Sequence, residues 1–284
     1  KIESMRVLIT GHQGFIGRNL GPYLQHMGHE VEGYEYIENK VPDPKDYDRV
    51  VHLGAISSTT ERDVEKVLKQ NLEFSQRLLQ LCDQSGTTLI YASSASVYGN
   101  TQAQNDMKTI KENDKVYPQS PYSWSKYLFD KMVMEIPEYR INVQGLRLFN
   151  VYGPGEQDKG DQQSVFGKFE LQAKNLKEIT VFEKSEHIKR DFIWVGDVCQ
   201  IIEKMFHVDA TDIWNVGTGV APSFMDIANG YAKLYDAKVK TVPLPDNLAG
   251  QYQYYTCADN TKLINSIGEY KFKTVQEYID ASKT

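Results

Sequence analysis

The sequence predicts an α/β protein in which a doubly wound parallel sheet is followed by a smaller C-terminal lobe. Strand patterns alternate with helical stretches up to residue 153, and a glycine-rich turn joins the first strand to the first helix. Beyond residue 153 this alternation breaks down. We therefore expect a sheet domain of residues 1–153, to which residues 191–219 return, and a lobe of residues 154–190 and 220–284.

Composition and charge disfavour several classes of partner. The 284 residues carry a net charge of −6 without a basic block, which argues against a nucleic-acid partner. No apolar run approaches the ~20 residues of a membrane span, and no charged-then-apolar signal segment opens the chain. The cysteines, Cys82, Cys199 and Cys257, form neither a metal-ligand nor a disulfide pattern. We expect a cytoplasmic protein with no membrane partner and no metal.

The first strand pattern, residues 6–10, runs into a glycine-rich turn and then into a helical stretch, residues 18–27. Strand, turn and helix in this order are the setting in which such a turn binds a dinucleotide. Gly11 permits the tight turn, Gly14 lets the backbone approach a pyrophosphate, and Gly17 lets the helix pack on the strand. The helix N-terminus presents free N–H groups to the phosphates. The predicted cofactor-binding turn is completed by Gln13, Phe15 and Ile16.

Residues 30–36 form the second predicted strand, whose end usually meets the adenosine ribose. Glu35, with Tyr36 beside it, is the candidate, because a carboxylate accepts both ribose hydroxyls and favours NAD over NADP. Asn39 or Lys40 could instead tolerate a 2′-phosphate, so this choice stays open. The next strand, residues 49–55, follows so soon that we expect the sheet to lack a unit here or to carry only a remnant.

The third strand ends in the small residues Gly54 and Ala55, as a strand passing under a cofactor needs, and we expect these two and Leu53 to bind the cofactor. A polar segment from Ser57 follows, and helical periodicity resumes over residues 64–82. Asn71 lies within this helix. If buried, it fixes loop backbone beside the cofactor; an exposed polar residue is an equal alternative.

The next buried strand, residues 88–92, delivers Ser93 and Ser94 to its carboxyl end, where ligands of an open parallel sheet bind. Ser94 is suited to a substrate oxygen, although a double serine also suits a helix or turn cap. Downstream, Tyr122 and Lys126 lie four residues apart, on one face of a helix. An ammonium near a phenol favours the phenolate, so Tyr122 is the candidate general base.

The rest of the chain supplies a further strand and the lobe. Residues 144–149 form a strand that enters Asn150 and Val151, whereas residues 100–120 and 157–163 are expected to be loops. The expected helices and strands alternate less regularly after this point: helices at 165–175, 196–207 and 223–235, strands at 179–182, 213–217 and 240–244, a loop at 245–251 and two short C-terminal helices.

With these motifs in place, the sequence resembles the extended short-chain dehydrogenases/reductases that act on nucleotide-activated sugars. The matching elements span nearly the whole chain, and they are residues 10–17, 91–94, 98–99, Tyr122 with Lys126, 146–154 and 190–192. The resemblance implies a Rossmann domain, bound NAD or NADP, and a C-terminal lobe that holds a nucleotide-sugar substrate.

Within that family the resemblance favours epimerisation. Dehydratases carry an acidic pair directly after the active-site serine or threonine, where this chain has Ala95 and Ser96. The related reductases use a cysteine donor, and no cysteine occurs near Ser94 or Tyr122. The sequence is similar in particular to the ADP-glycero-manno-heptose 6-epimerases, through residues 54–61, 150–154 with 159–160, 182–185, 189–192, 215–219, and 245–246 with 252–253.

This similarity implies two proton acceptors, Tyr122 and Lys159, although a solvated loop lysine is the alternative for Lys159. Arg190 is suited to a diphosphate because its fork donates two parallel hydrogen bonds. Two positions depart from the family pattern, Asp161 in place of a serine and Lys168 in place of a histidine. The implied substrate-binding residues are Ser57, Ser94, Asn150, Asp161, Lys168, Phe182, Glu183, Ser185, Arg190 and Tyr252.

Alternatives remain open at this stage. A UDP-hexose 4-epimerase needs only one base and a rotating sugar, and another nucleotide-sugar reductase or dehydratase is a further reading. A protein that has kept the dinucleotide site as a sensor or scaffold is the non-enzyme alternative, which the joint presence of Ser94, Tyr122 and Lys126 disfavours. The resemblance also implies a homo-oligomer, most simply a dimer through the helices around residues 64–82 and 124–136.

Overall fold

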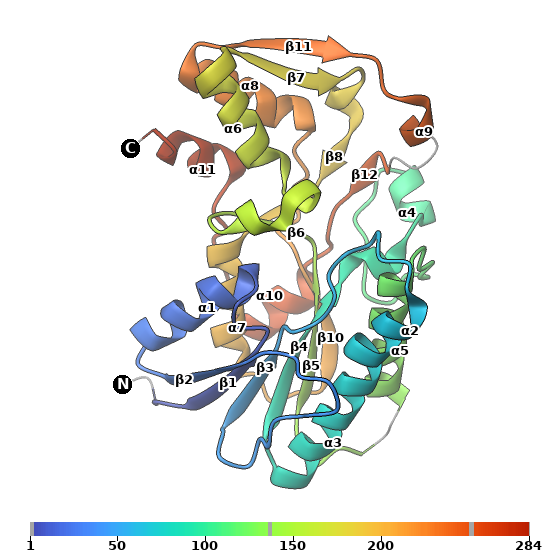
Figure 1. Ribbon diagram of the computed structural model, residues 1–284, viewed down its shortest axis with the longest axis vertical. Helices are drawn as coiled ribbons and strands as arrows, with labels where there is room; N and C mark the ends of the chain where they lie inside the picture. Colours follow the sequence, from blue (N-terminus) through green and yellow to red (C-terminus); the bar gives the residue numbers. More distant parts are fainter. Residues whose placement is uncertain (1–2, 136–137, 250–252, 284) are drawn as a thin grey trace.

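The computed structural model describes residues 3–135, 138–249 and 253–283 (Figure 1). Six parallel strands form its central sheet in the order β10-β5-β4-β3-β1-β2. Their bounds are β1 (Arg6–Thr10), β2 (Glu30–Tyr34), β3 (Arg49–His52), β4 (Thr88–Ser94), β5 (Val143–Leu148) and β10 (Asp212–Val216). Because β2 and β3 pair with opposite sides of β1, the strand order reverses at β1, and this reversal is where an open α/β sheet binds its ligand.

Helices cover both faces of the sheet, which confirms the doubly wound prediction (Figure 1). One face carries α1 (Phe15–His26), α7 (Val195–Met205) and α10 (Thr261–Ile267). The other carries α2 (Val64–Val67), the π-helical turn η1 (Leu68–Glu73), α3 (Phe74–Ser85) and α5 (Pro121–Glu135). Strand β5 is buried along its whole length because it is covered on both sides.

The segment between β2 and β3 contains no helix, so β3 follows β2 directly across β1. This confirms the expectation that the sheet lacks a unit here. In its place residues 35–48 form a loop that packs partly buried aromatic and aliphatic side chains on the α3 side of the sheet, namely Tyr36, Val41 and Tyr47.

The stretch of residues 100–120 is not the plain surface loop that its polarity predicts. Thr101 caps a short helix, α4 (Gln102–Asn105), in a capping box with Gln104, and it follows the 3-10 helix η2 (Ala95–Tyr98). Ile110 is buried because its backbone pairs with the strand segment at Ala258. The polar composition of residues 100–120 gave no sign in the sequence of this backbone pairing at Ile110.

The lobe lies above the carboxyl ends of the strands of the central sheet (Figure 1). Its core is aromatic, with Tyr152 stacked on Phe166 at a ring distance of 4.0 Å. Its elements are β6 (Asn150–Tyr152), α6 (Val165–Leu176), β7 (Glu178–Phe182), η4 (Ser185–His187), β8 (Lys189–Arg190), β9 (Phe192–Trp194), α8 (Phe224–Tyr235), β11 (Lys238–Val242), β12 (Tyr255–Thr256) and α11 (Val275–Ala281).

Two lobe segments predicted as loops contain short helices. Residues 157–163 fall largely in the 3-10 segment η3 (Glu156–Gln162), and residues 245–251 include α9 (Asp246–Ala249). Helix α10, inside the range predicted for the lobe, packs instead on β10 and α7 of the sheet domain. None of the helices in the described ranges combines the length and apolar character needed to cross a bilayer.

Candidate active site

A cavity of about 650 Å³ lies where the carboxyl ends of β1 and β3 meet the lobe. Most of the predicted site residues line it, from both the sheet domain and the lobe. They are Gly11, Gly14, Phe15, Ile16, Gly17, Glu35, Tyr36, Leu53, Gly54, Ala55, Ser57, Asn150, Val151, Lys159 and Arg190. The fold therefore brings together residues that are up to 179 positions apart (from Gly11 to Arg190) in one space.

The glycine turn forms the floor of this cavity and leaves no room for side chains. A Cβ at Gly11 would lie 2.6 Å from the Gly54 Cα, and Gly11 has a φ of +71° that favours glycine. A Cβ at Gly17 would lie 2.3 Å from the Gly11 carbonyl oxygen. Helix α1 begins at Phe15, three residues earlier than predicted, with Gly14 as its N-cap. Because Gly14 has no side chain, the first-turn amides stay open to an anion, which fits a dinucleotide pyrophosphate.

Glu35 lies at the ribose end of the cradle. Its carboxylate accepts a hydrogen bond of 2.7 Å from the Gln13 backbone N–H and lies 3.1 Å from His12 Nδ1. Gln13 thus shapes the turn through its backbone rather than by lining the cavity. Neither Asn39 nor Lys40 lines the cavity. The group placed to meet ribose hydroxyls is therefore an acid.

Asn71 is buried, with 3% of its surface exposed, and it fixes the loop after β3. Its side chain makes two hydrogen bonds with the backbone of Ile56, accepting from N–H at 2.8 Å and donating to C=O at 3.0 Å. It also donates to Ser125 Oγ on the helix of Tyr122. The π-helical turn η1 places Asn71 at this junction, and such turns often mark functional sites.

Ser94, Tyr122 and Lys126 lie next to one another and to Ala92. Ala92 lines the cavity, whereas these three residues are not among its lining residues. The Lys126 Nζ donates to the Ala92 carbonyl at 2.8 Å and lies 5.8 Å from the centre of the Tyr122 ring. Ser94 hydrogen-bonds Tyr122 and also accepts from the Ser96 N–H, so it caps η2 as well. The cap that a double serine suits is therefore present, and the same hydroxyl also reaches Tyr122.

The ionisation of the pair differs from the prediction. Burial raises the pKa of Tyr122, the hydrogen bond with Ser94 lowers it, and the negative Asp130 raises it, with a net increase. Burial lowers the pKa of Lys126 to about 8, against an opposing effect of Asp130. The expected lowering of the Tyr122 pKa is therefore not produced by the protein chain alone, because burial outweighs the effect of Ser94.

Lys159 faces the cavity rather than bulk solvent. Its Nζ lies 4.1 Å from the centre of the Phe15 ring and 3.8 Å from Glu156 Oε1. Burial lowers the pKa of Lys159, and Glu156 partly opposes this. The lowered pKa makes Lys159 a better candidate for proton exchange than a solvated lysine would be.

The remaining predicted substrate residues divide into four groups. Arg190 faces the main cavity, and its guanidinium lies 5.7 Å from the Phe224 ring centre. Lys168, Phe182 and Ser185 line an adjoining pocket of about 140 Å³ that shares Phe224 with the cavity. Glu183 is exposed and lines neither space. Tyr252 and the side chain of Asp161 lie outside the described residues.

Two groups in the site were missed at the level of sequence. Glu156 lines the cavity, and its carboxylate accepts from the Gly153 and Ser164 N–H groups at 3.1 and 3.0 Å. An acid three residues before Lys159 is the signal that could have found it. His52 is buried and bonded to Thr10 at 2.6 Å, and a lone histidine ending a strand gave no comparable signal. No cluster of three or more metal-ligating side chains occurs in the part of the chain that the structure covers.

A parallel sheet with a glycine cradle at its strand-order reversal is a dinucleotide-binding Rossmann fold, and a Tyr–Lys pair lies beside this cradle. A family model described as the NAD dependent epimerase/dehydratase family matches residues 7–217, and the chain belongs to this family. Its cofactor is thus a nicotinamide dinucleotide, as predicted.

Three solved structures are similar over nearly the whole chain. The Helicobacter pylori ADP-L-glycero-D-manno-heptose-6-epimerase is 28% identical, with a TM-score of 0.85 over 98% of this chain and 95% of that one. An NAD-dependent NDP-hexosamine 5,6-dehydratase involved in tunicamycin biosynthesis is 25% identical, with a TM-score of 0.80 over 97% and 95%. The Thermotoga maritima UDP-glucose 4-epimerase is 23% identical, with a TM-score of 0.81 over 97% and 96%, and shows the shared fold alone.

Proposed function

We propose that the protein is a nucleotide-sugar epimerase that inverts one sugar carbon through a transient keto intermediate. One observation carries the proposal: a single cavity joins the glycine cradle to Lys159 and Arg190 of the lobe. A nicotinamide, a second proton-transfer group and a diphosphate-binding cation would therefore face the same substrate. An ADP-heptose is the proposed substrate, supported by the motif resemblance and by 28% identity to the Helicobacter pylori enzyme.

Bound NAD or NADP would take up the hydride and return it. Tyr122 removes the proton of the substrate hydroxyl, and Ser94 aligns and polarises the same oxygen. Lys126, whose Nζ donates to the Ala92 carbonyl, and the positive nicotinamide ring of bound NAD or NADP would together supply the charge that favours the Tyr122 phenolate. After the keto sugar turns, Lys159 serves as the acid/base on its other side.

Dehydration is the competing chemistry, because one similar structure is a dehydratase. Ala95 and Ser96 stand where family dehydratases carry an acidic pair, and neither side chain can relay protons in an elimination. Both lie in η2, directly after Ser94. Epimerisation needs no third acid at this place.

Incubation with ADP-, UDP-, GDP- and dTDP-sugars, followed by NMR of the sugar carbons, tests the proposal. Inversion of one centre is expected, and Tyr122→Phe should lower kcat by about 10² or more, the usual effect of losing a positioned base. Tyr117→Phe, at an exposed tyrosine just before the same helix, is the matched control. Undiminished turnover in Tyr122→Phe would show that the base is misassigned. A complete lack of turnover with intact NAD binding would favour a dinucleotide-sensing protein.

Lys159→Met separates the two-base site from a one-base site with a rotating sugar, as in UDP-hexose 4-epimerases. A loss of epimerisation with unchanged NAD affinity is expected, because Lys159 meets the cradle at the Phe15 ring, 4.1 Å from its Nζ. Lys177→Met, whose ammonium bonds the Tyr235 carbonyl at the edge of the lobe, is the control. Full epimerase activity in Lys159→Met would remove the second base and leave Tyr122 in place.

A further inference from the structure

Helix α5 carries a third polar residue on the face of Tyr122 and Lys126. Asp130 follows Lys126 by four residues and Tyr122 by eight, so the three lie one turn apart in a row. Asp130 is 1% exposed, and nothing in the proposed reaction uses it. A buried carboxylate is costly unless it is fully paired, so its presence behind a catalytic pair needs a reason.

Each member of the row contacts the end of β4. Ser94 contacts Tyr122, the Ala92 carbonyl accepts from Lys126 Nζ, and the Tyr91 and Ser93 hydroxyls donate to Asp130 at 2.8 and 2.9 Å. The four-residue step from Tyr122 to Lys126 advances about 6 Å, close to the ~6.6 Å of the two-residue step from Ser94 to Ala92, and the two hydroxyls on either side of Ala92 then hold the next turn of the helix at Asp130. Asp130 is thus the inner anchor that sets the register of the helix on the strand.

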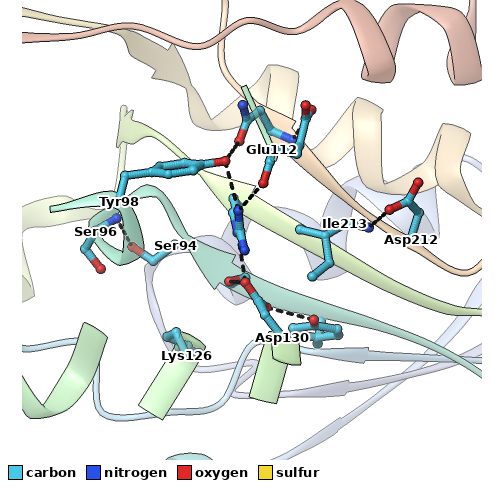
Figure 2. Close-up of polar contacts among 12 residues, drawn as sticks. Ser94, Ser96, Tyr98, Glu112, Lys126, Asp130, Asp212 and Ile213 are labelled. Carbon is cyan, nitrogen blue, oxygen red and sulfur yellow. Dashed lines mark hydrogen bonds and ion pairs between the residues drawn. The ribbon is translucent and has the colours of Figure 1, made fainter. Parts of the chain in front are cut away.

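Asp130 has a buried counter-ion. Arg147 on β5 donates from Nε to Asp130 Oδ2 at 2.8 Å and from Nη1 to the Tyr98 hydroxyl and the Glu112 carbonyl, each at 3.1 Å. Tyr98 donates in turn to Asn215 on β10. Figure 2 shows these contacts running in a line from Asp130, below Ser94 and beside Lys126, up to Glu112. The anchor is therefore held from three strands and from η2.

We propose that Asp130, with Arg147 as its counter-ion, is a positioning residue for the reaction: it holds Tyr122 and Lys126 in register with Ser94 and keeps the Lys126 ammonium charged. This inference rests on the proposed roles of those three residues. Asp130 touches none of the reacting atoms and acts through the helix and through its charge.

The other groups around Lys126 do not replace that charge. On α5 the neighbour is Tyr122, a neutral phenol at ordinary pH because burial raises its pKa. His52 on β3 is neutral because burial lowers its pKa to about 3. Tyr91 and Ser93 on β4 are hydroxyls, Asn71 on η1 is an amide, and Tyr98 on η2 is neutral because burial raises its pKa to about 12. Arg147 on β5 is positive, and the Glu112 carboxylate accepts from the Asn215 N–H rather than facing Lys126.

Lysine-selective NMR titration of the full chain, with and without NAD, tests the charge role, with the Lys126 signal assigned by its loss in Lys126→Arg. Asp130→Asn should move the Lys126 titration down by roughly one pH unit, the order produced by a nearby opposite charge. Glu135→Gln removes an exposed acid from the same helix, where it pairs with Lys131, and should leave the titration unchanged. An Asp130→Asn shift no larger than that of Glu135→Gln would overturn the proposal.

Tyr91→Phe gives a second test if Asp130→Asn fails to fold. This change removes one of the hydroxyl groups that donate to the Asp130 carboxylate, so the negative charge acts more strongly on Lys126. The titration of Lys126 should therefore move to higher pH, opposite to the shift in Asp130→Asn. A shift to lower pH, or no shift, in Tyr91→Phe contradicts the charge role.

With an active sugar nucleotide, Asp130→Asn should also lower kcat at least tenfold without a matching rise in KM, and unchanged kcat would overturn the register role. The titration needs no substrate, so lack of epimerase activity would sink the proposed function without deciding this inference.

Discussion

Replacing His52 by asparagine should remove a pH dependence of stability that one buried imidazole imposes on the fold. His52 is 4% exposed and lies between two hydroxyls, with Nδ1 2.6 Å from Thr10 Oγ1 and Nε2 2.7 Å from Ser75 Oγ. Thr10 Oγ1 already accepts from the Gly54 N–H, so its own proton points to Nδ1. The neutral ring, protonated at Nε2, satisfies every partner, and a second proton has no place.

Burial lowers the pKa of His52 to about 3 in the folded protein, and the charge of Lys126 adds to the effect. In the unfolded chain the pKa is about 6.5. The stability from keeping the ring neutral is complete above pH 6.5 and is lost as pH falls toward 3, because the unfolded chain binds a proton that the fold refuses. At pH 5 the loss from this one group is about 2 kcal/mol, from 1.5 pH units at about 1.4 kcal/mol each.

Urea unfolding at intervals from pH 8 to pH 5 measures this effect. His52→Asn should be less stable at pH 8 by ~1 kcal/mol for the lost hydrogen bond, yet it should lose about 2 kcal/mol less than the parent between pH 8 and pH 5. His187→Gln, at a histidine whose side chain is 70% exposed, is the control and should follow the parent. Equal losses in the parent and in His52→Asn would refute the assignment of a neutral buried ring.

Three further predictions concern the cofactor and assembly. Gly17→Ala should weaken NAD binding at least tenfold by calorimetry, because its Cβ would meet backbone at 2.3 Å, whereas Gly21→Ala on the same helix meets nothing and should bind normally. Glu35→Gln should lower the preference for NAD over NADP about tenfold, since it removes a charge that repels a 2′-phosphate. Trp124→Glu, on the exposed face of α5, should convert the predicted dimer to a monomer in sedimentation, and Leu171→Glu on the lobe should not.

Elements with strong local signals were predictable from the sequence. The glycine turn, the strands on either side of it and the Tyr122–Lys126 spacing each depend on neighbours within a few residues, and the structure places all of them as expected. The missing sheet unit was readable as a short gap between β2 and β3. Helix starts were less accurate, since α1 begins at Phe15, where glycine and a lack of polar caps hid the boundary.

The features that escaped prediction depend on partners far away in the chain. The π-helical turn places Asn71 where its side chain hydrogen-bonds both Ile56 and Ser125, and no local sequence pattern indicates these two contacts. In the sequence Asp130 looks like an ordinary polar residue of an amphipathic helix, because its ion-pair partner, Arg147, lies on a distant strand, β5. The pKa of Tyr122 is also raised where the sequence predicted a lowered value. Burial of the phenol raises it in the protein chain alone, without the charge of a cofactor.

The position of Lys159 depends on how the lobe docks on the sheet domain. Its segment is tied to α1 by Arg18, which pairs with Asp158 at 2.5 Å and donates to the Gly155 carbonyl at 2.7 Å. On the other side Gln162 donates to Ser58 in the loop after β3 at 2.7 Å. Both ties cross from the lobe to the cofactor cradle and flank Lys159. Because exposed ion pairs are individually weak, the lysine is held by their combination and by the Phe15 ring. The role proposed for Lys159 therefore depends on how two parts of the chain are arranged, which a lysine–glycine step in the sequence cannot convey.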